Sequence, residues 1–200
     1  SRSQIISEPY GVTLVIAPWN YPLQLMLSPL VGAIAAGNSC ILKPSEYAVA
    51  TQNLIARIFK EGFSEDYLAV VTGDYQVSEE LLREKFDFIF FTGSTEVGRK
   101  VMLAAAQNLT PVCLELGGKS PCVIDATADL NLAARRVAWG KWYNAGQTCV
   151  APDFLYVHES VYTEFVQKLK QMVHTFYGEN PQTSPDYGRI ISDRHASRLV

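Results

Sequence analysis

The stretch Val12-Thr13-Leu14-Val15-Ile16-Ala17 decides the fold. It is almost entirely apolar and rich in β-branched residues, which is the composition of a strand covered on both faces. Strands of that kind occur mainly in parallel sheets that carry helices on both sides. The sequence therefore predicts an α/β fold in which further strands alternate with helices.

Three more apolar stretches follow, separated by segments with helical spacing of apolar residues. We expect strands at 39–43, 68–72 and 86–91, and helices at 23–36, 48–60, 77–85 and from about 95 to 107. Pro29 should bend the first helix, and Gly37-Asn38 should end it. Alternating strands and helices imply right-handed crossovers and a doubly wound, Rossmann-like parallel sheet.

The second half continues the alternation, with strands at 121–124 and 154–157 and helices at 130–143 and 161–176. We expect a dinucleotide-binding domain over 1–115 and part of an α/β catalytic domain over 116–200. The chain opens on Ser1 and closes on a helix-like run without a stop signal. We therefore expect a fragment of a longer protein.

Composition narrows the function classes. The chain is 48% hydrophobic and 18% charged, so it forms a globular core. A net charge of −3 and the lack of a long basic run argue against nucleic acid as a partner. The three histidines lack ligand spacing, so we expect no metal site. The cysteines form no CxxC pair, which favours a reducing, cytoplasmic location (Cys40, Cys113, Cys122 and Cys149).

Polar side chains follow the first two strands. Pro18-Trp19-Asn20-Tyr21-Pro22 presents an indole and a carboxamide, and Lys43 and Glu46 come just after the second strand. Ligands of open α/β sheets bind at this edge, where Lys43 and Glu46 could bond the hydroxyls of a ribose. The alternatives are a solvated ion pair at a helix start and, for Asn20, a turn residue bonding its own backbone.

The segment Thr92-Gly93-Ser94-Thr95-Glu96-Val97-Gly98 joins a strand to a helix through a glycine turn. Unpaired N–H groups and the positive end of the helix dipole make such a turn a candidate phosphate site. The pattern is weak alone, because it is neither GxGxxG nor a Walker loop.

Glu115 lies in an apolar strand between two leucines. We expect it to be buried, with a pKa raised by burial, and to serve as a general base. The alternative is a carboxylate on the solvent face of an alternating strand. Gly117, in the glycine pair that follows, would let the backbone approach a ligand closely.

Asn144-Ala145-Gly146-Gln147-Thr148-Cys149-Val150-Ala151-Pro152 places a single thiol in a polar turn. Gly146 and Pro152 favour turns at the two ends of this segment, so the turn can hold Cys149 and its N–H at a fixed angle to a bound carbonyl. A thiol there is a candidate nucleophile. The alternative is an inert small hydrophobic residue, which is the more common role of a lone cysteine.

Together and in this order, these segments closely resemble the NAD(P)-dependent aldehyde dehydrogenase superfamily, and most of all its class 3 branch for fatty and aromatic aldehydes. The resemblance covers essentially all 200 residues. It implies that Cys149 attacks the aldehyde, that the Asn20 amide and the Cys149 N–H form an oxyanion hole, and that Glu115 activates water.

The resemblance also implies a cofactor site. Lys43 and Glu46 would bind the adenosine ribose, with Trp19 and Gly117 nearby, and Gly93, Ser94 and Gly98 would form the pyrophosphate turn. A carboxylate at Glu46 should repel a 2′-phosphate, which favours NAD. Lys43 acts in the opposite direction, so NADP stays an alternative.

The chain departs from the family pattern in length, and the downstream Glu-x-Phe-Gly-Pro segment is absent. The expected function is oxidation of an aldehyde to an acid through a thiohemiacetal and a thioester, in a protein that forms a homodimer at full length. An acylating aldehyde dehydrogenase is one alternative, disfavoured by Glu115. A non-catalytic nucleotide-binding or oligomerising fragment is another. The sequence leaves open which aldehyde is used and whether a C-terminal membrane anchor follows.

Overall fold

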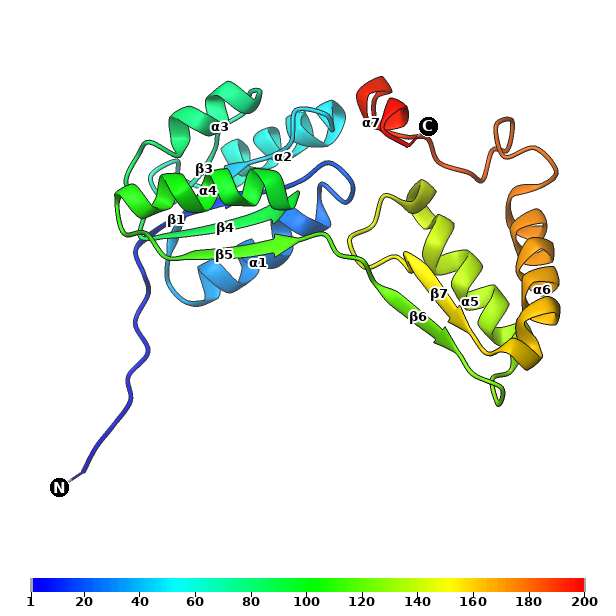
Figure 1. Ribbon diagram of the computed structural model, residues 1–200. Helices are drawn as coiled ribbons and strands as arrows, with labels where there is room; N and C mark the ends of the chain where they lie inside the picture. Colours follow the sequence, from blue (N-terminus) through cyan, green and yellow to red (C-terminus); the bar gives the residue numbers. More distant parts are fainter. Residues whose placement is uncertain (1, 200) are drawn as a thin grey trace. The chain divides into compact units, whose positions relative to one another are not determined.

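A computed structural model describes residues 2–199, and the chain divides into two compact units. One unit ends at Leu116 and the other begins at Gly117. In Figure 1 the first carries β1–β5 with α1–α4, and the second carries β6, β7 and α5–α7. The division of function between 1–115 and 116–200 remains a prediction.

The first unit is built on a five-stranded sheet in the order β3-β2-β1-β4-β5, and every pair in it is parallel. Its strands are β1 (Val12–Ile16), β2 (Ser39–Lys43), β3 (Leu68–Val70), β4 (Phe88–Gly93) and β5 (Val112–Leu116). The central strand is β1, the stretch from which the sheet was predicted. The doubly wound α/β fold is confirmed.

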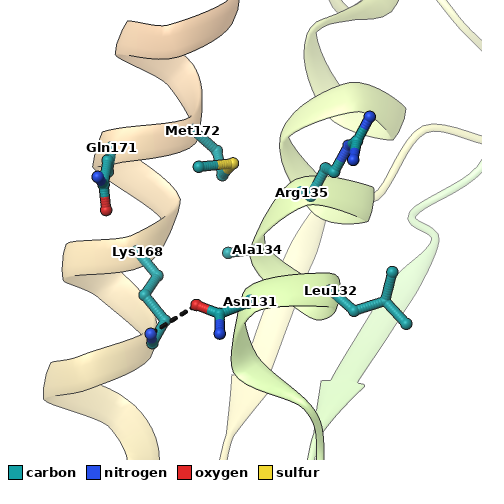
Figure 2. Close-up of a pocket in the computed structure, with 7 residues that line it drawn as sticks. All are labelled: Asn131, Leu132, Ala134, Arg135, Lys168, Gln171 and Met172. Carbon is teal, nitrogen blue, oxygen red and sulfur yellow. Dashed lines mark hydrogen bonds between the residues drawn. The ribbon is translucent and has the colours of Figure 1, made fainter.

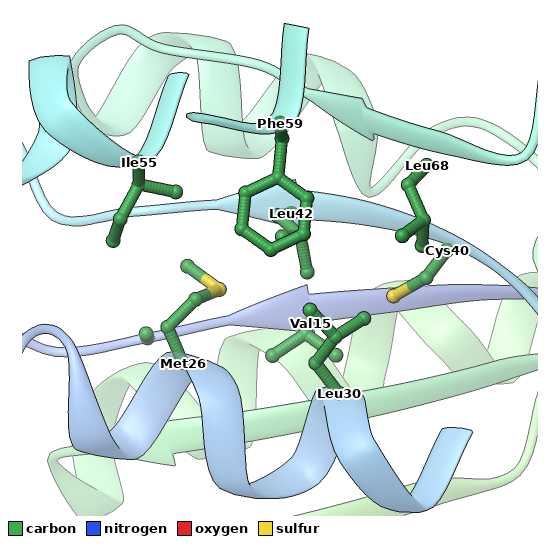
Figure 3. Close-up of a cluster of buried hydrophobic side chains, with 9 residues drawn as sticks. Val15, Met26, Leu30, Cys40, Leu42, Ile55, Phe59 and Leu68 are labelled. Atoms are coloured by element: carbon green, nitrogen blue, oxygen red, sulfur yellow. The ribbon is translucent and has the colours of Figure 1, made fainter. Parts of the chain in front are cut away.

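Helices cover both faces of this sheet. Helices α1 (Gln24–Ala35) and α2 (Val49–Gly62) pack on one face, and α3 (Tyr75–Leu81) and α4 (Thr95–Gln107) on the other. Figure 3 shows the first core, where α1 and α2 meet the sheet around Val15. Leu14 and Ile16 turn to the second core. Burying a Leu, Ile or Phe side chain contributes about 1.5–3 kcal/mol, so β1 stabilises both layers.

Polar side chains set several boundaries that the sequence pattern placed differently. Helix α3 begins at Tyr75 instead of Val77 because Asp74 caps it, accepting the Gln76 N–H at 2.9 Å. Strand β4 begins at Phe88 instead of Phe86, and the Asp87 carboxylate just before it accepts the Val12 N–H at 2.8 Å. Strand β3 ends at Val70, two residues earlier than predicted.

Asn38 joins the end of α1 to the start of β1. Gly37, at φ 87°, ends the helix as predicted, and the Asn38 side chain is only 3% exposed. Its Oδ1 accepts the Gly11 N–H and its Nδ2 donates to the Ala33 carbonyl, both at 2.9 Å. One amide group therefore fixes the helix against the central strand.

The second unit repeats the strand–helix pattern on a smaller scale. Strands β6 (Pro121–Ile124) and β7 (Phe154–Val157) are parallel and are joined through α5 (Leu130–Trp142). Helix α6 (Glu159–Tyr177) packs with α5 over a core of Ile124, Ala134, Val137 and Phe165. A short helix, α7 (Asp193–Ser197), follows. None of the helices within residues 2–199 has the length and hydropathy needed to cross a membrane.

We predict that Asn38→Ala lowers the melting temperature of the full-length protein. The change leaves the Gly11 N–H without its side-chain partner, and an unsatisfied buried donor costs about 1–3 kcal/mol. The Ala33 carbonyl keeps the Asn38 main-chain N–H at 3.1 Å but loses its second hydrogen bond. Thermal unfolding followed by circular dichroism measures the effect. Asn53→Ala is the matched control, because Asn53 is exposed on α2 and alanine favours helices. Equal melting of Asn38→Ala and wild type would contradict the prediction.

Candidate functional site

The carboxyl edge of the five-stranded sheet gathers most of the predicted cofactor residues. Ile16, the last residue of β1, lies opposite Lys43, the last residue of β2, and opposite Phe91 in β4, so the carboxyl ends of the three strands lie at the same edge. The half-buried Trp19 and Asn20 follow β1 at this edge, Gly93 is the last residue of β4, and Ser94 comes directly after it. The strand order reverses between β1 and β4, the position at which α/β sheets bind nucleotides.

Lys43 is a buried cation. It is 1% exposed, its Nζ donates to the Pro44 carbonyl at 2.9 Å, and it lies 3.6 Å from a carboxylate oxygen of the half-buried Glu46. Burial lowers the pKa of Lys43, while attraction to Glu46 and to Asp74 opposes that shift. The alternative of a solvated ion pair is therefore wrong for Lys43. Keeping a charge in this position is costly, which favours a functional role.

The turn after β4 opens helix α4. Ser94 caps the helix, its Oγ accepting the Val97 N–H at 3.2 Å, and the first turn is exposed. The remaining N–H groups of a first turn lack helical partners and suit an anion. Gly98 differs, because its N–H donates to the Ser94 carbonyl at 2.8 Å. A Cβ on Gly98 would lie 2.8 Å from Leu116, so this glycine lets α4 approach β5.

Glu115 is exposed, so the expectation of a buried carboxylate is wrong. Leu114 and Leu116 pack into the core beneath α4. Successive side chains of a strand point to opposite faces, so Glu115 points away from that core. The solvent-face alternative describes its position correctly. Gly117 is also exposed, and an added Cβ would meet nothing within 4 Å.

Cys149 lies in a turn that follows a left-handed segment. Helix α5 ends at Trp142, and Asn144, Ala145 and Gly146 have φ of 53°, 54° and 77° within η1 (Tyr143–Gly146). A left-handed conformation costs a residue other than glycine about 1–2 kcal/mol. The Ala151 N–H then donates to the Thr148 carbonyl at 3.2 Å. Cys149 sits at the exposed tip of this tight turn.

Ion pairs hold the end of the turn. The Asp153 carboxylate lies 2.8 Å from the Lys119 ammonium and 4.0 Å from that of Lys141. The hydrogen bond from the Lys119 side chain lowers the pKa of the Asp153 carboxyl group. The main-chain N–H of Asp153 also donates to the Ser120 carbonyl at 2.9 Å. Gln147 holds the start of the turn through hydrogen bonds of its side chain, a role that the sequence pattern did not predict. The feature of the sequence that could have indicated this role is the position of Gln147, two residues before Cys149.

The other three thiols are less accessible. Cys40 is 2% exposed, and burial raises its pKa to about 11. Cys113 in β5 and Cys122 in β6 are half-buried. Cys149 is the one exposed cysteine of the four. Its geometry fits a nucleophile better than an inert core residue.

A groove lies between α5 and α6, and Figure 2 shows the side chains that line it. Lys168 donates across it to the Asn131 carboxamide oxygen at 2.6 Å. Asn131 belongs to the first turn of α5, whereas Cys149 comes after the last turn of that helix. The groove contains none of the predicted site residues and is separate from the candidate nucleophile.

The structure thus gathers Trp19, Asn20, Lys43, Gly93 and Ser94 at one edge of the first unit. Cys149 belongs to the second unit. Its convergence with Asn20 and Glu115 remains a prediction, as do the roles of all these residues.

Comparison with known proteins gives a consistent result. The family model described as "Aldehyde dehydrogenase family" matches residues 1–200. The chain is 53% identical over 193 residues to the 4,4'-diapolycopene-4,4'-dial dehydrogenase of Cytobacillus firmus. It is 53% identical over 196 residues to the dimeric NADP-preferring aldehyde dehydrogenase of Mus musculus. These matches cover 96% and 98% of the chain, and 43% of each relative.

Solved structures agree. The substrate-bound state of Staphylococcus aureus AldH matches with a TM-score of 0.91 at 49% identity, over 96% of this chain and 42% of that one. A Mycobacterium tuberculosis aldehyde dehydrogenase complexed with NAD+ matches with a TM-score of 0.87 at 35% identity, over 96% and 40%. The chain spans less than half the length of these proteins.

We predict that iodoacetamide labels Cys149 first and Cys40 last in the folded full-length protein at pH 8. The thiolate is the reactive form, and at that pH the buried Cys40 is almost wholly protonated because its pKa is raised to about 11. Peptide mass spectrometry over time gives the order, and labelling in denaturant is the control in which Cys40 becomes accessible. Equal rates for Cys40 and Cys149 in the folded protein would contradict the assignment.

Proposed function

Because this chain belongs to the aldehyde dehydrogenase family, we propose that the protein carrying it oxidises an aldehyde to a carboxylic acid with NAD(P). The observation that carries the proposal is the exposed Cys149 thiol, presented at the tip of a turn that is held at both ends. The relatives' names support the reaction class. The activity of the whole protein is part of the proposal, since the chain spans 43% of these relatives.

In the first step the Cys149 sulfur attacks the aldehyde carbon, and the carbonyl oxygen becomes an oxyanion. The Asn20 carboxamide and the Cys149 N–H donate hydrogen bonds to that oxygen. Such donors act most strongly where charge develops, and losing one costs about 10²–10³ in turnover. The product of this step is a thiohemiacetal on Cys149.

The edge residues fit a dinucleotide. Lys43 and Glu46 would hold the adenosine ribose, and the capped N-terminus of α4 at Gly93-Ser94 would face the pyrophosphate. When bound at this edge, NAD(P) would supply the hydride acceptor, and loss of the hydride from the thiohemiacetal would leave a thioester on Cys149. We propose NAD, since Glu46 repels a 2′-phosphate, with NADP as the alternative because Lys43 attracts one.

Glu115 completes the reaction by taking a proton from the water that attacks the thioester. Its exposed carboxylate is accessible to water, which this role requires. Hydrolysis releases the acid and restores the thiol. An acylating enzyme passes the acyl group to another acceptor and needs no such base, so Glu115 argues for the hydrolytic reaction.

The substrate class is a medium-chain, long-chain or aromatic aldehyde. The class 3 resemblance supports this choice, and the chain is 53% identical over 192 residues to aldehyde dehydrogenase family 3 member A2 of Mus musculus. A homodimer is the proposed assembly, since a close relative is named as dimeric. The free thiols of all four cysteines support a cytoplasmic location.

We predict that the full-length wild type reduces NAD with hexanal or benzaldehyde and that Cys149→Ala abolishes this activity. Alanine cannot form the thiohemiacetal, and the exposed position tolerates the smaller side chain. Absorbance of NADH measures the rate. Cys122→Ala is the control that removes a half-buried thiol and should keep the activity. NADH formation by Cys149→Ala at the wild-type rate would refute the proposed role.

We predict that Glu115→Gln produces a burst of about one NADH per active site followed by slow turnover, because hydride transfer precedes hydrolysis of the thioester. Loss of a general base slows its step by about 10²–10⁴-fold. Stopped-flow absorbance resolves the two phases. Glu79→Gln, an exposed change on α3, should behave as wild type. Loss of the burst together with turnover would show that Glu115 acts before hydride transfer.

A further inference from the structure

Gln147, two residues before Cys149, uses its whole carboxamide on main-chain groups. Its Nε2 donates to the carbonyls of Asn144 and Arg189, both at 3.0 Å, and its Oε1 accepts the Ile191 N–H at 2.9 Å. A primary amide has two N–H donors, so both are engaged. No other neutral side chain of similar length offers two donors and an acceptor in one plane.

The first of these bonds closes the left-handed turn. The Asn144 carbonyl accepts both the Gln147 side chain and the Gln147 main-chain N–H, the latter at 3.1 Å. Asn144 and Ala145 hold positive φ, a conformation that persists only when surrounding contacts impose it. Gln147 supplies contacts of this kind.

The other two bonds fasten the turn to the loop after α6. Arg189 organises that loop, donating to the carbonyls of Gln182 and Tyr187, both at 2.7 Å. Gly188 lies against the left-handed turn, where an added Cβ would be 3.7 Å from the Ala145 nitrogen. The loop between α6 and α7 therefore supports the turn that carries the thiol, and the Gln147 side chain connects the two.

We propose that Gln147 is a positioning residue for the Cys149 sulfur, a role that rests on the proposed function. Only Thr148 separates the two residues, and its N–H donates to the Gly146 carbonyl at 2.9 Å. A shift of the Gln147 backbone therefore reaches Cys149 directly. Without the three bonds the left-handed turn relaxes, and the sulfur leaves its line of attack while the cofactor edge is unchanged.

Two substitutions in the full-length protein test this role. Gln147→Glu keeps the shape but removes both donors and sets a negative charge against two carbonyl oxygens. Gln147→Met keeps the length and removes all three bonds. Gln167→Glu makes the same charge change at an exposed position on α6 and is the matched control.

For both Gln147 variants we expect kcat to fall about 10–100-fold, since a displacement near 1 Å can cost about 10²-fold. The KM for NAD should stay at the wild-type value. Gln167→Glu should match wild type in both constants. Rates are compared well below the melting temperature of each variant, so that a loss of stability alone cannot reduce them.

The pH dependence separates positioning from general damage. When the introduced carboxyl group of Gln147→Glu is protonated, it donates one hydrogen bond again. The ratio of its kcat to that of wild type should therefore rise as pH falls from 8 to 5.5, whereas the ratio for Gln147→Met should stay flat. Wild-type kcat in both variants, or a lower melting temperature with kcat retained, would overturn the proposal.

Alkylation keeps the two proposals distinguishable. If wild type forms no NADH with any aldehyde, the proposed function fails. The iodoacetamide rate at Cys149 then decides the positioning proposal alone. A changed rate in both Gln147 variants but not in Gln167→Glu supports it, and an unchanged rate overturns it.

Discussion

Strand β1 is paired in parallel on both sides, and the carboxyl edge of the five-stranded sheet, where the cofactor site is proposed, depends on that pairing. Its register with β2 and β4 brings three strand ends together, so the loop carrying Asn20, the buried Lys43 and the start of α4 share one edge. Both faces of β1 are buried, by α1 and α2 on one side and by α3 and α4 on the other. A slip of one residue would exchange the two cores, so packing fixes the register and the register fixes the edge.

Two features of the chain oppose stability, and both occur where function is proposed. Lys43 keeps an ammonium group almost out of contact with solvent, where the Pro44 carbonyl and Glu46 compensate for part of the cost and Asp74 adds a weaker attraction. Asn144 and Ala145 hold a left-handed backbone next to the Cys149 turn. A buried charge or a left-handed backbone lowers stability and persists only where the surrounding structure holds it in place. Such features are concentrated at binding and catalytic sites. In the second unit, Gln147 and Asp153 provide that support.

Local pattern was sufficient to predict the strands and helices and the edge on which the polar residues lie. It was also sufficient for Glu115, where leucines on both sides of a carboxylate are the period-two pattern of a half-exposed strand. We gave more weight to the apolar neighbours and expected burial. The family resemblance implied that Gly98 belongs to the pyrophosphate turn, a role that stays a prediction, and the structure adds that this glycine lets α4 pack closely on Leu116.

Other features had no local signal. Alanine strongly favours right-handed helices, so nothing marked Ala145 as left-handed. Two of the three side-chain bonds of Gln147 reach residues more than 40 positions away, beyond the range of any periodicity. The central claim is that the Cys149 sulfur carries the acyl group. Acid quenching of full-length enzyme during a single turnover with NAD and benzaldehyde, followed by peptide mass spectrometry, tests it most directly. The account predicts a benzoyl adduct on the peptide containing Cys149, whereas benzoate formation with that peptide unmodified throughout would contradict it.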